Sequence, residues 1–352
     1  MKIKPQASLI TNKSNIRYLS DFTGSTGFIL LTKPKKYLFT DFRYIKRAKN
    51  TIKKGIEIVD TTKMWKNPDE LKKNWQKILK NHRVNALGIE ESSLTIAKFK
   101  KFKKISGGKI KFTDISGKIE KLREIKSKKE INLIRNSQRI NEKVFLEIKK
   151  IVQKNLNSKK TLTERNLAWN IKELGHKFGT EDVSFDPIVS FGKNTAIPHH
   201  LPDKTRLKKG DIILIDMGMK YKGYCSDMTR ILFTKIPTKF QKEIYNLVLK
   251  AQKTAIKGIK AGISGKKADK FARDIINKAG YKENFGHGSG HGVGLDIHEA
   301  PSLSENYTKT IKNNSIITIE PGIYLENHFG IRIEDMILVT KTGNKNLTKI
   351  PK

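Results

Sequence analysis

Acidic residues close apolar, strand-like runs at two places in this chain of 352 residues. Asp216 ends the run 212–215 (IILI), and Glu320 ends the run 316–319 (IITI). Apolar runs without alternation predict strands that are buried on both faces. A carboxylate carried into such surroundings has to be paired, protonated or bound to a cation. The fold must therefore bring compensating charge to the ends of its buried strands.

Two further carboxylates lie where they can join the same site. Asp227 follows Asp216 by eleven residues, across a turn with two glycines, which favours adjacent antiparallel strands. Glu334 ends the alternating stretch 331–334, in which residues 332 and 334 leave one face of a strand. Asp216 alone fits a structural carboxylate bonded to backbone, but four inward-facing carboxylates repel one another unless cations compensate them. Two divalent ions would bring four positive charges against these four negative ones.

A histidine- and glycine-rich stretch lies between these strands. Three of the eight histidines (His287, His291 and His298) fall within twelve residues, in a stretch, 286–298, that holds five glycines. Glycine lets backbone approach an ion closely, and a neutral imidazole is a common metal ligand. Four carboxylates and one imidazole make an oxygen-rich ligand set with a single nitrogen. Such a set suits Mn²⁺, Co²⁺, Fe²⁺ or Zn²⁺ and differs from a site built on thiolates. Two such ions can acidify a water molecule and stabilise the oxyanion of an attacked carbonyl.

The composition favours a reducing compartment and argues against a membrane-spanning or secreted protein. The single cysteine, Cys225, excludes an intramolecular disulfide and fits a reducing compartment; we expect it to be a packing residue. No apolar run has the roughly 18–20 residues that span a bilayer, and no apolar core follows the basic N-terminal residues as it would in a secretory signal. We therefore expect a cytoplasmic protein without a membrane partner.

The net charge of +38 would ordinarily indicate a nucleic-acid partner. The excess is mostly lysine, however, and it is spread along the whole chain. Its densest run, 98–104, also fits a helix that buries Ile96, Phe99 and Phe102 on one face. We expect a solvated basic helix there and no nucleic-acid partner, with a nucleic-acid patch as the weaker alternative.

The chain divides into two domains of the α/β (α+β) class, with a boundary near 117–126. Residues 1–122 alternate strands with helices, which favours a mixed or parallel sheet covered by helices. The predicted strands are 28–31 and 37–40, joined as a hairpin, 57–60 and 84–89, and the predicted helices are 67–81 and 95–104.

The second domain begins with a capping box, Ser127 to Glu130, that opens a long amphipathic helix to about residue 154. A second helix, 163–174, is predicted to end at Gly175. Strands at 187–190, 211–217 and 231–233 and helices at 240–257 and 267–279 follow.

The order Asp, Asp, His, Glu, Glu closely resembles the dinuclear metallopeptidase family with the pita-bread fold, which includes methionine aminopeptidase, prolidase and aminopeptidase P. The resemblance implies a second functional histidine seven residues after the ligand histidine, which His298 satisfies for His291. His287 is the competing ligand, with packing beside the site as its other reading. The implied metal ligands are Asp216, Asp227, His291, Glu320 and Glu334.

The resemblance extends to the surroundings of this set. His199, in the loop 192–202, matches a family histidine that contacts substrate, and we expect His200 to be its exposed neighbour. Arg332 resembles a residue that braces the metal carboxylates; an ion pair with Glu334 or Asp335 is its structural alternative.

The N-terminal part carries its own resemblance. Segments 15–19, 22–27 and 40–44 are similar to the N-terminal domain of Xaa-Pro peptidases, which methionine aminopeptidases generally lack. This implies a creatinase-like domain, residues 1–122, followed by a catalytic pita-bread domain, residues 123–352. It also favours proline-directed activity.

The function implied is hydrolysis of Xaa-Pro bonds at peptide N-termini by a bridging hydroxide on two divalent ions per subunit. Mn²⁺ is expected first, with Co²⁺, Zn²⁺ and Fe²⁺ as alternatives. Glu320, His298 and His199 would be catalytic, and His199, His298 and Arg332 would bind substrate. The implied partners are a peptide with proline at its second position and a second copy of the chain in a homodimer.

Two rival classes stay open, a peptidase of another specificity and a non-catalytic binding protein. A methionine-type aminopeptidase or a dipeptide-only prolidase would use the same metal site. Some family members have lost their ligands and bind RNA or histones, and creatinase shares the layout without using metal. Both of these are disfavoured because the sequence supplies all five ligands.

Overall fold

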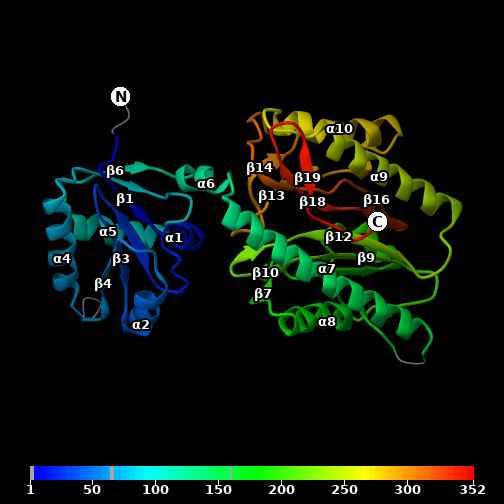
Figure 1. Ribbon diagram of the computed structural model, residues 1–352, viewed down its shortest axis with the longest axis horizontal. Helices are drawn as coiled ribbons and strands as arrows, with labels where there is room; N and C mark the ends of the chain where they lie inside the picture. Colours follow the sequence, from blue (N-terminus) through cyan, green and yellow to red (C-terminus); the bar gives the residue numbers. More distant parts are fainter. Residues whose placement is uncertain (1–3, 64–66, 159–160) are drawn as a thin grey trace. The chain divides into compact units, whose positions relative to one another are not determined.

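The computed structural model describes residues 4–63, 67–158 and 161–352. The chain forms two compact units, Met1–Arg123 and Glu124–Lys352. Each unit combines β-sheet with covering helices (Figure 1), which confirms the predicted α/β (α+β) class.

The first unit is built on one six-stranded sheet in the order β4-β3-β2-β1-β5-β6. Its central strand β1 pairs antiparallel with β2 and parallel with β5, so the sheet is mixed. Strands β2 and β3 form the predicted antiparallel hairpin. The strands are β1 (Ala7–Ile10), β2 (Phe28–Leu31), β3 (Lys36–Thr40), β4 (Ile56–Asp60), β5 (Ala86–Ile89) and β6 (Lys111–Asp114).

Helices cover both faces of this sheet because its strands are apolar on both faces. Leu9 of β1 belongs to the core formed with α4 and α5, whereas its neighbour Ile10 belongs to the core formed with α1 and α2. The helices are α1 (Lys13–Ser20), α2 (Phe42–Thr51), α4 (Pro68–Asn81), α5 (Ile96–Ser106) and α6 (Lys118–Arg123).

Two helix predictions in this unit had different outcomes. Helix α4 begins where predicted, and the Asn67 side chain accepts hydrogen bonds from the first backbone amides. The apolar face predicted for α5 was partly wrong, because Ile96 is 74% exposed while Phe102 and Ile105 are buried. Ile96 is the first residue of the helix, whereas the buried residues Phe102 and Ile105 lie in its second half.

The second unit contains several short sheets. One has the order β12-β9-β8, another β14-β13-β15-β18-β19, a third β11-β10-β7, and β16 pairs with β17. The strands are β7 (Asp182–Val183), β8 (Ile188–Phe191), β9 (Ile212–Met217), β10 (Met219–Tyr221), β11 (Tyr224–Cys225), β12 (Met228–Phe233), β13 (Gly290–Gly292), β14 (Glu299–Leu303), β15 (Ile316–Ile319), β16 (Gly322–Leu325), β17 (Phe329–Arg332), β18 (Asp335–Val339) and β19 (Asn344–Asn346).

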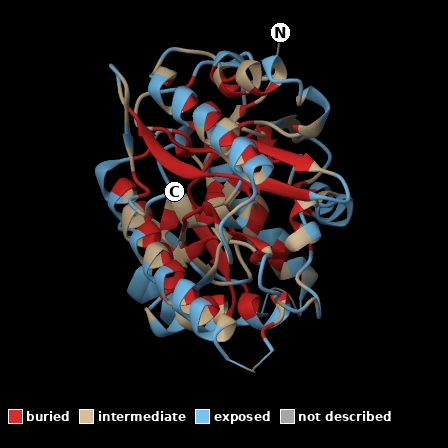
Figure 2. Cartoon of the chain, turned by 90° about the vertical axis from the view of Figure 1, so that its right-hand side faces the viewer, coloured by how far each residue is buried: buried red, intermediate tan, exposed pale blue. Residues whose placement is uncertain are grey.

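Long helices pack outside these sheets, with strands buried and the outer helix faces exposed (Figure 2). They are α7 (Lys128–Leu156), α8 (Glu164–Lys177), α9 (Lys239–Gly258) and α10 (Gly265–Lys278), with 3₁₀ turns η1 (Gly192–Ala196) and η2 (Lys282–Asn284). The predicted capping box of Ser127 and Glu130 opens α7. Gly175 lies inside α8 and does not end it, so that prediction was wrong. A Cβ there would lie 2.8 Å from Met219 Sδ, so the glycine permits close packing.

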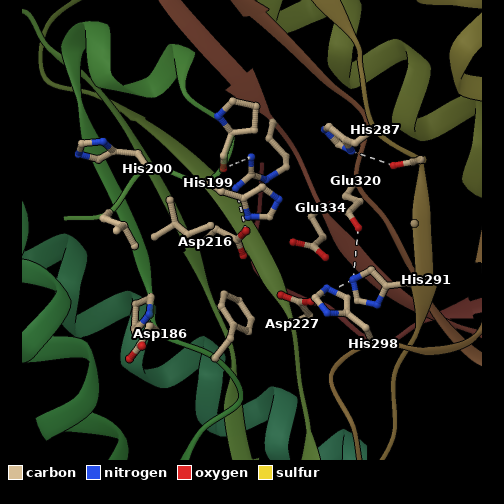
Figure 3. Close-up of a pocket in the computed structure, with 18 of the residues that line it drawn as sticks. Asp186, His199, His200, Asp216, Asp227, His287, His291, His298, Glu320 and Glu334 are labelled. Atoms are coloured by element: carbon tan, nitrogen blue, oxygen red, sulfur yellow. Dashed lines mark hydrogen bonds and ion pairs between the residues drawn. The ribbon is translucent and has the colours of Figure 1, made fainter. Parts of the chain in front are cut away.

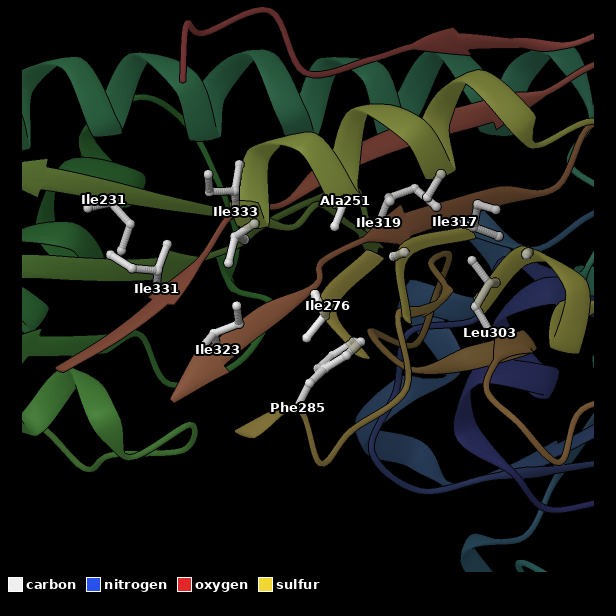
Figure 4. Close-up of a cluster of buried hydrophobic side chains, with 14 of the residues drawn as sticks. Ile231, Ala251, Ile276, Phe285, Leu303, Ile317, Ile319, Ile323, Ile331 and Ile333 are labelled. Atoms are coloured by element: carbon white, nitrogen blue, oxygen red, sulfur yellow. The ribbon is translucent and has the colours of Figure 1, made fainter. Parts of the chain in front are cut away.

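The central strand β9 shows how the core sets up the site. Ile213 and Ile215 pack in a core with α7 and α8, whereas Ile212 and Leu214 pack in a core with α9 and α10. The latter core also holds residues of β15, β16 and β17 (Figure 4). Asp216 follows in the same alternation as Leu214, so its carboxylate faces the second half of the unit.

Candidate metal centre

The two aspartates come from neighbouring strands, as predicted. Asp216 lies near the end of β9, and Asp227 immediately precedes β12, its antiparallel partner. The register places Thr229 of β12 directly opposite Asp216. Both carboxylates are buried, at 8% and 4% exposure.

The remaining candidates come from the second half of the unit. His291 lies in β13, Glu320 follows β15, and Glu334 follows β17. These side chains and the two aspartates point toward one another in a cavity of about 450 Å³ (Figure 3). Ligand atoms of Asp227, His291 and Glu334 all lie within 4.8 Å of one another.

The orientation of the His291 ring exposes one nitrogen to two carboxylates. Its Nδ1 lies 3.1 Å from the carbonyl oxygen of Gly292, so this nitrogen carries the proton and donates. Its Nε2 faces Asp227 Oδ2 at 3.5 Å and Glu320 Oε1 at 3.3 Å. Burial lowers the pKa of His291, so in the neutral ring a lone pair points at carboxylate oxygens. A cation held among these three atoms removes that conflict.

The carboxylates themselves lack enough donors. Among the described residues, none donates a hydrogen bond to Oδ1 of Asp216, Oδ1 of Asp227 or Oε1 of Glu334, although all three atoms are buried. Burial and the neighbouring carboxylates raise the pKa of Asp227 and of Glu334 well above their ordinary values. Burial also raises the pKa of Glu320. Unsatisfied buried oxygens gathered around one imidazole fit divalent cations that prefer oxygen and nitrogen ligands.

Arg332 contacts a different carboxylate from the two considered in the sequence. Its Nη2 donates to Asp216 Oδ2 at 2.8 Å, and its Nη1 donates to Tyr324 Oη at 2.8 Å. The predicted alternative, an ion pair with Glu334 or Asp335, was wrong, since Asp335 pairs with another arginine. The bracing geometry thus involves strand β9, more than a hundred residues away.

His287 has both ring nitrogens occupied by hydrogen bonds. Its Nδ1 lies 2.8 Å from the carbonyl oxygen of Gly288, and its Nε2 lies 2.9 Å from Tyr324 Oη. Burial raises the pKa of Tyr324 to about 12, so its hydroxyl stays protonated and donates to His287. This arrangement favours His291 over His287 as the ligand.

Comparison with known proteins now decides the family. Residues 132–341 match the Metallopeptidase family M24, and residues 4–125 match the Creatinase/Prolidase N-terminal domain. The chain belongs to metallopeptidase family M24. It is therefore a hydrolase of peptide bonds, and membership of this family implies divalent metal ions.

Similar proteins cover nearly the whole of this M24 peptidase. The Xaa-Pro dipeptidase of Pyrococcus horikoshii is 37% identical over 345 residues, which are 97% of this chain and 92% of the relative. A solved Xaa-Pro dipeptidase from Bacillus anthracis superposes with a TM-score of 0.91 at 36% identity, covering 99% of this chain and 94% of that one. A solved X-Pro aminopeptidase from Thermotoga maritima MSB8 gives a TM-score of 0.88 at 34% identity, covering 99% and 96%.

Two other histidines of the M24 peptidase border the cavity. The ring of His298 lies 4.3 Å from that of His291, centroid to centroid, at an angle of 69°. His199 is exposed on the loop after η1 and lines the same cavity. Both can therefore reach a bound substrate.

His200 is buried, so the prediction of an exposed neighbour was wrong. Its Nε2 lies 2.7 Å from Glu164 Oε2, and its ring points away from the carboxylate cluster (Figure 3). Glu164, His200 and Asp203 form a second group with metal-ligand spacing. Both oxygens of Glu164 already accept hydrogen bonds, from Phe191 N and Asp203 N among others, so this group anchors the loop.

Three polar residues of the site were not predicted. Thr229 donates to Glu334 Oε2 at 2.7 Å, and Thr318 donates to Glu320 Oε1 at 3.1 Å. Tyr324 joins Arg332 to His287. The only available signal was their position within two to four residues of a predicted ligand.

Within the part of the chain that the structure describes, no helix combines the length and apolarity needed to cross a bilayer. Cys225 is buried in β11, and burial raises the pKa of its thiol to about 11. A thiol that stays protonated at neutral pH fits the predicted packing role.

Proposed function

We propose that this M24 peptidase is a metal-dependent aminopeptidase that hydrolyses the bond between an N-terminal residue and a following proline. The observation that carries the proposal is the unprotonated Nε2 of His291 facing Asp227 and Glu320. Support for the substrate comes from the relatives, which are named Xaa-Pro dipeptidase and X-Pro aminopeptidase. The catalytic domain of this proposal is residues 123–352, and residues 1–122 form the N-terminal domain.

The residues proposed to hold two divalent ions fit that task by number and type. Asp216 would hold one ion, His291 and Glu320 the other, and Asp227 and Glu334 both. Two such ions supply a water of lowered pKa and polarise the scissile carbonyl. Mn²⁺ is our first expectation, with Co²⁺, Zn²⁺ or Fe²⁺ accepted by the same donor set.

Glu320 is the proposed proton carrier of the reaction. It takes the proton of the attacking water and passes it to the proline nitrogen as the peptide bond breaks. The hydroxyl of Thr318 donates to its Oε1, which fixes the orientation of the carboxylate. Burial raises the pKa of Glu320 above its ordinary 4.5 in the metal-free protein. Bound cations would favour the ionised carboxylate that accepts the water proton.

His298, His199 and Arg332 are the proposed substrate-contacting groups. The imidazole N–H groups of His298 and His199 would donate hydrogen bonds to the substrate carbonyl and stabilise negative charge that develops on its oxygen. Arg332 also donates to the carbonyl oxygen of Pro198 at 3.2 Å, which holds the residue before His199. The loop that carries His199 is thereby tied to the carboxylate cluster.

Reconstitution tests this proposal. Metal-stripped protein would be loaded with Mn²⁺, Co²⁺, Zn²⁺ or Fe²⁺ one at a time and assayed on Xaa-Pro dipeptides, Xaa-Pro-Yaa tripeptides and Met-Ala peptides. We expect activity on Xaa-Pro substrates that returns with metal and saturates at two ions per chain. Cleavage of Met-Ala peptides in preference would contradict the proline assignment, and no activity with any ion would favour a non-catalytic role.

The same panel separates an aminopeptidase from a dipeptide-only prolidase, since only the former cleaves the tripeptides. We also propose a cytoplasmic homodimer, as the family resemblance implies. Light scattering coupled to size-exclusion chromatography checks the dimer, and a monomeric mass would contradict it.

A further inference from the structure

The segment 285–289 (FGHGS) leads directly into β13 and carries His287. It contains two glycines and lies outside any helix or strand. Glycine-rich backbone loses more conformational entropy on ordering than other backbone does, so a fixed position requires specific anchors. Besides Tyr324 and the backbone of Glu320, two residues on one face of helix α10 anchor this segment.

Arg273 and Asp269 form an ion pair one turn apart on α10. Arg273 Nε lies 2.6 Å from Asp269 Oδ2, and Nη2 lies 3.0 Å from Oδ1. The two side chains are only 12% and 1% exposed. Because both side chains are buried, their two hydrogen bonds hold the pair in one geometry. We call this pair, Asp269 and Arg273, the bracket.

The arginine holds the first part of the segment. Its Nη1 donates to the carbonyl oxygen of Phe285 at 3.1 Å, and its Nη2 donates to that of His287 at 2.7 Å. Its guanidinium carbon lies 4.4 Å from the centre of the Phe285 ring. Arg273 thus contacts the backbone on both sides of Gly286.

The aspartate holds the last residue of the segment and, through it, a candidate metal ligand. Asp269 Oδ1 accepts hydrogen bonds from Ser289 N at 3.0 Å and Ser289 Oγ at 2.7 Å. The carbonyl oxygen of Ser289 in turn accepts a hydrogen bond from the backbone N–H of Glu320 at 2.9 Å. Two residues beyond Ser289 lies His291.

We propose that Arg273 and Asp269 are positioning residues for the metal centre, which they act on through the backbone of residues 285–289. The inference rests on the proposed metal function of His291 and Glu320. Among the described residues, those that line the cavity of about 450 Å³ do not include Arg273 or Asp269. Groups that orient metal ligands without touching the ion commonly change metal affinity by about 10–100-fold when they are lost.

The chemistry of the pair requires these two residue types. Arginine offers several donors in a planar fork, which here reach a carboxylate and two carbonyls at once; a lysine ammonium cannot match that geometry. Replacing Asp269 with asparagine would place an amide NH₂ in a site where arginine and serine both donate. Arg273→Lys and Asp269→Asn therefore disrupt the bracket with little change in volume.

The same helix provides a matched control. Lys270 and Asp274 form another pair one turn apart, but their charged atoms are 4.0 Å apart and the side chains are 69% and 46% exposed. Exposed pairs of this kind contribute little to stability. Lys270→Met therefore reports what the loss of an ordinary helix ion pair does.

The experiment compares the wild type with Asp269→Asn, Arg273→Lys and Lys270→Met. Mn²⁺ binding to metal-stripped protein is measured by calorimetry, amide hydrogen exchange is followed over residues 285–290, and kcat and KM are determined separately. We expect Mn²⁺ binding to weaken by about 10–100-fold in the first two variants. Exchange should be faster in that segment, with a larger change in kcat than in KM. Lys270→Met should match the wild type in all three measurements.

The proposal would be overturned if both Asp269→Asn and Arg273→Lys bound Mn²⁺ with wild-type affinity and showed wild-type amide exchange over residues 285–290. Equal effects in Lys270→Met, or global unfolding of both bracket variants, would also overturn it, because the pair would then support the fold as a whole. If the wild type binds none of Mn²⁺, Co²⁺, Zn²⁺ and Fe²⁺, the proposed function fails, while the exchange comparison still decides whether α10 anchors the segment.

Discussion

Arg332 donates a hydrogen bond from Nη2 to Oδ2 of Asp216 at 2.8 Å, and both side chains are buried. The same guanidinium donates from Nε to Thr229 Oγ1 at 3.2 Å, and that hydroxyl donates to Glu334 Oε2 at 2.7 Å. The Arg332 guanidinium therefore orients two carboxylates, those of Asp216 and Glu334, that lie 118 residues apart in the chain. In each carboxylate the other oxygen, Oδ1 of Asp216 and Oε1 of Glu334, is buried and accepts no hydrogen bond from the described residues.

Arg332→Lys tests this bracing role. Lysine keeps the charge but cannot contact Asp216, Thr229 and Tyr324 at once, so we expect kcat/KM on an Xaa-Pro peptide to fall by about 10–100-fold. Arg332→Met leaves the buried carboxylate of Asp216 without its ion-pair partner, so it should lower the free energy of unfolding by about 3–5 kcal/mol. Urea titration measures the second effect. Arg139→Lys, at an exposed position, serves as control, and full activity in Arg332→Lys would exclude the role.

Glu320→Gln tests the proton carrier. The amide cannot accept the water proton, so kcat should drop by about 10²–10⁴-fold. Steady-state kinetics on a metal-loaded sample measure this, with metal content determined in parallel. Glu326→Gln, at an exposed glutamate of the same unit, should leave kcat unchanged. A Glu320→Gln enzyme with near-normal turnover would remove this residue from the mechanism.

A pair of histidine substitutions separates the two ligand assignments. His291→Ala removes the nitrogen that faces Asp227 and Glu320, so we expect it to retain fewer than two ions per chain. His287→Ala removes a ring whose nitrogens bond to Gly288 and Tyr324, so its metal content should stay at the wild-type level. Elemental analysis after dialysis measures both. The opposite pattern would show that His287 is the ligand.

Metal removal should make stability depend on pH in a defined direction. The pKa of Asp227 and of Glu334 is raised in the folded, metal-free protein above the ordinary 3.8 and 4.5. Protonation of these groups therefore stabilises the metal-free fold below those values, and this stability is lost as the pH rises through the raised folded pKa. Bound Mn²⁺ compensates the ionised carboxylates, and its binding competes with protons.

The gain in Tm on adding Mn²⁺ should consequently be larger at about pH 8 than at about pH 5.5. Differential scanning fluorimetry of the same sample with and without metal measures the gain. Because the gain is a difference between two Tm values at one pH, the pH dependence of the rest of the chain cancels. His291→Ala should show a small and nearly constant gain. A wild-type gain that falls as the pH rises would contradict the assignment.

Local features of the fold were predictable because their causes lie within a few residues. The capping box of Ser127 and Glu130 opens α7, and the apolar runs at 28–31 and 37–40 pair as a hairpin. Gly175 and Ile96 were misjudged because their surroundings are set by contacts with other elements, not by their own helix.

The sequence by itself determined the ingredients of the candidate site. Carboxylates that end apolar strands are costly to bury, and that cost is local, so Asp216 and Glu320 could be singled out without any structure. Only the tertiary structure decided how the site is held together. The partner of Arg332 on β9, the hydrogen bonds of His287 and the bracket of Arg273 and Asp269 all join segments that are distant or out of phase in sequence. The packing of sheets and helices determines the hydrogen-bond partners of these side chains. Hydrogen bonds between buried groups form only where packing brings donor and acceptor within about 3 Å of one another.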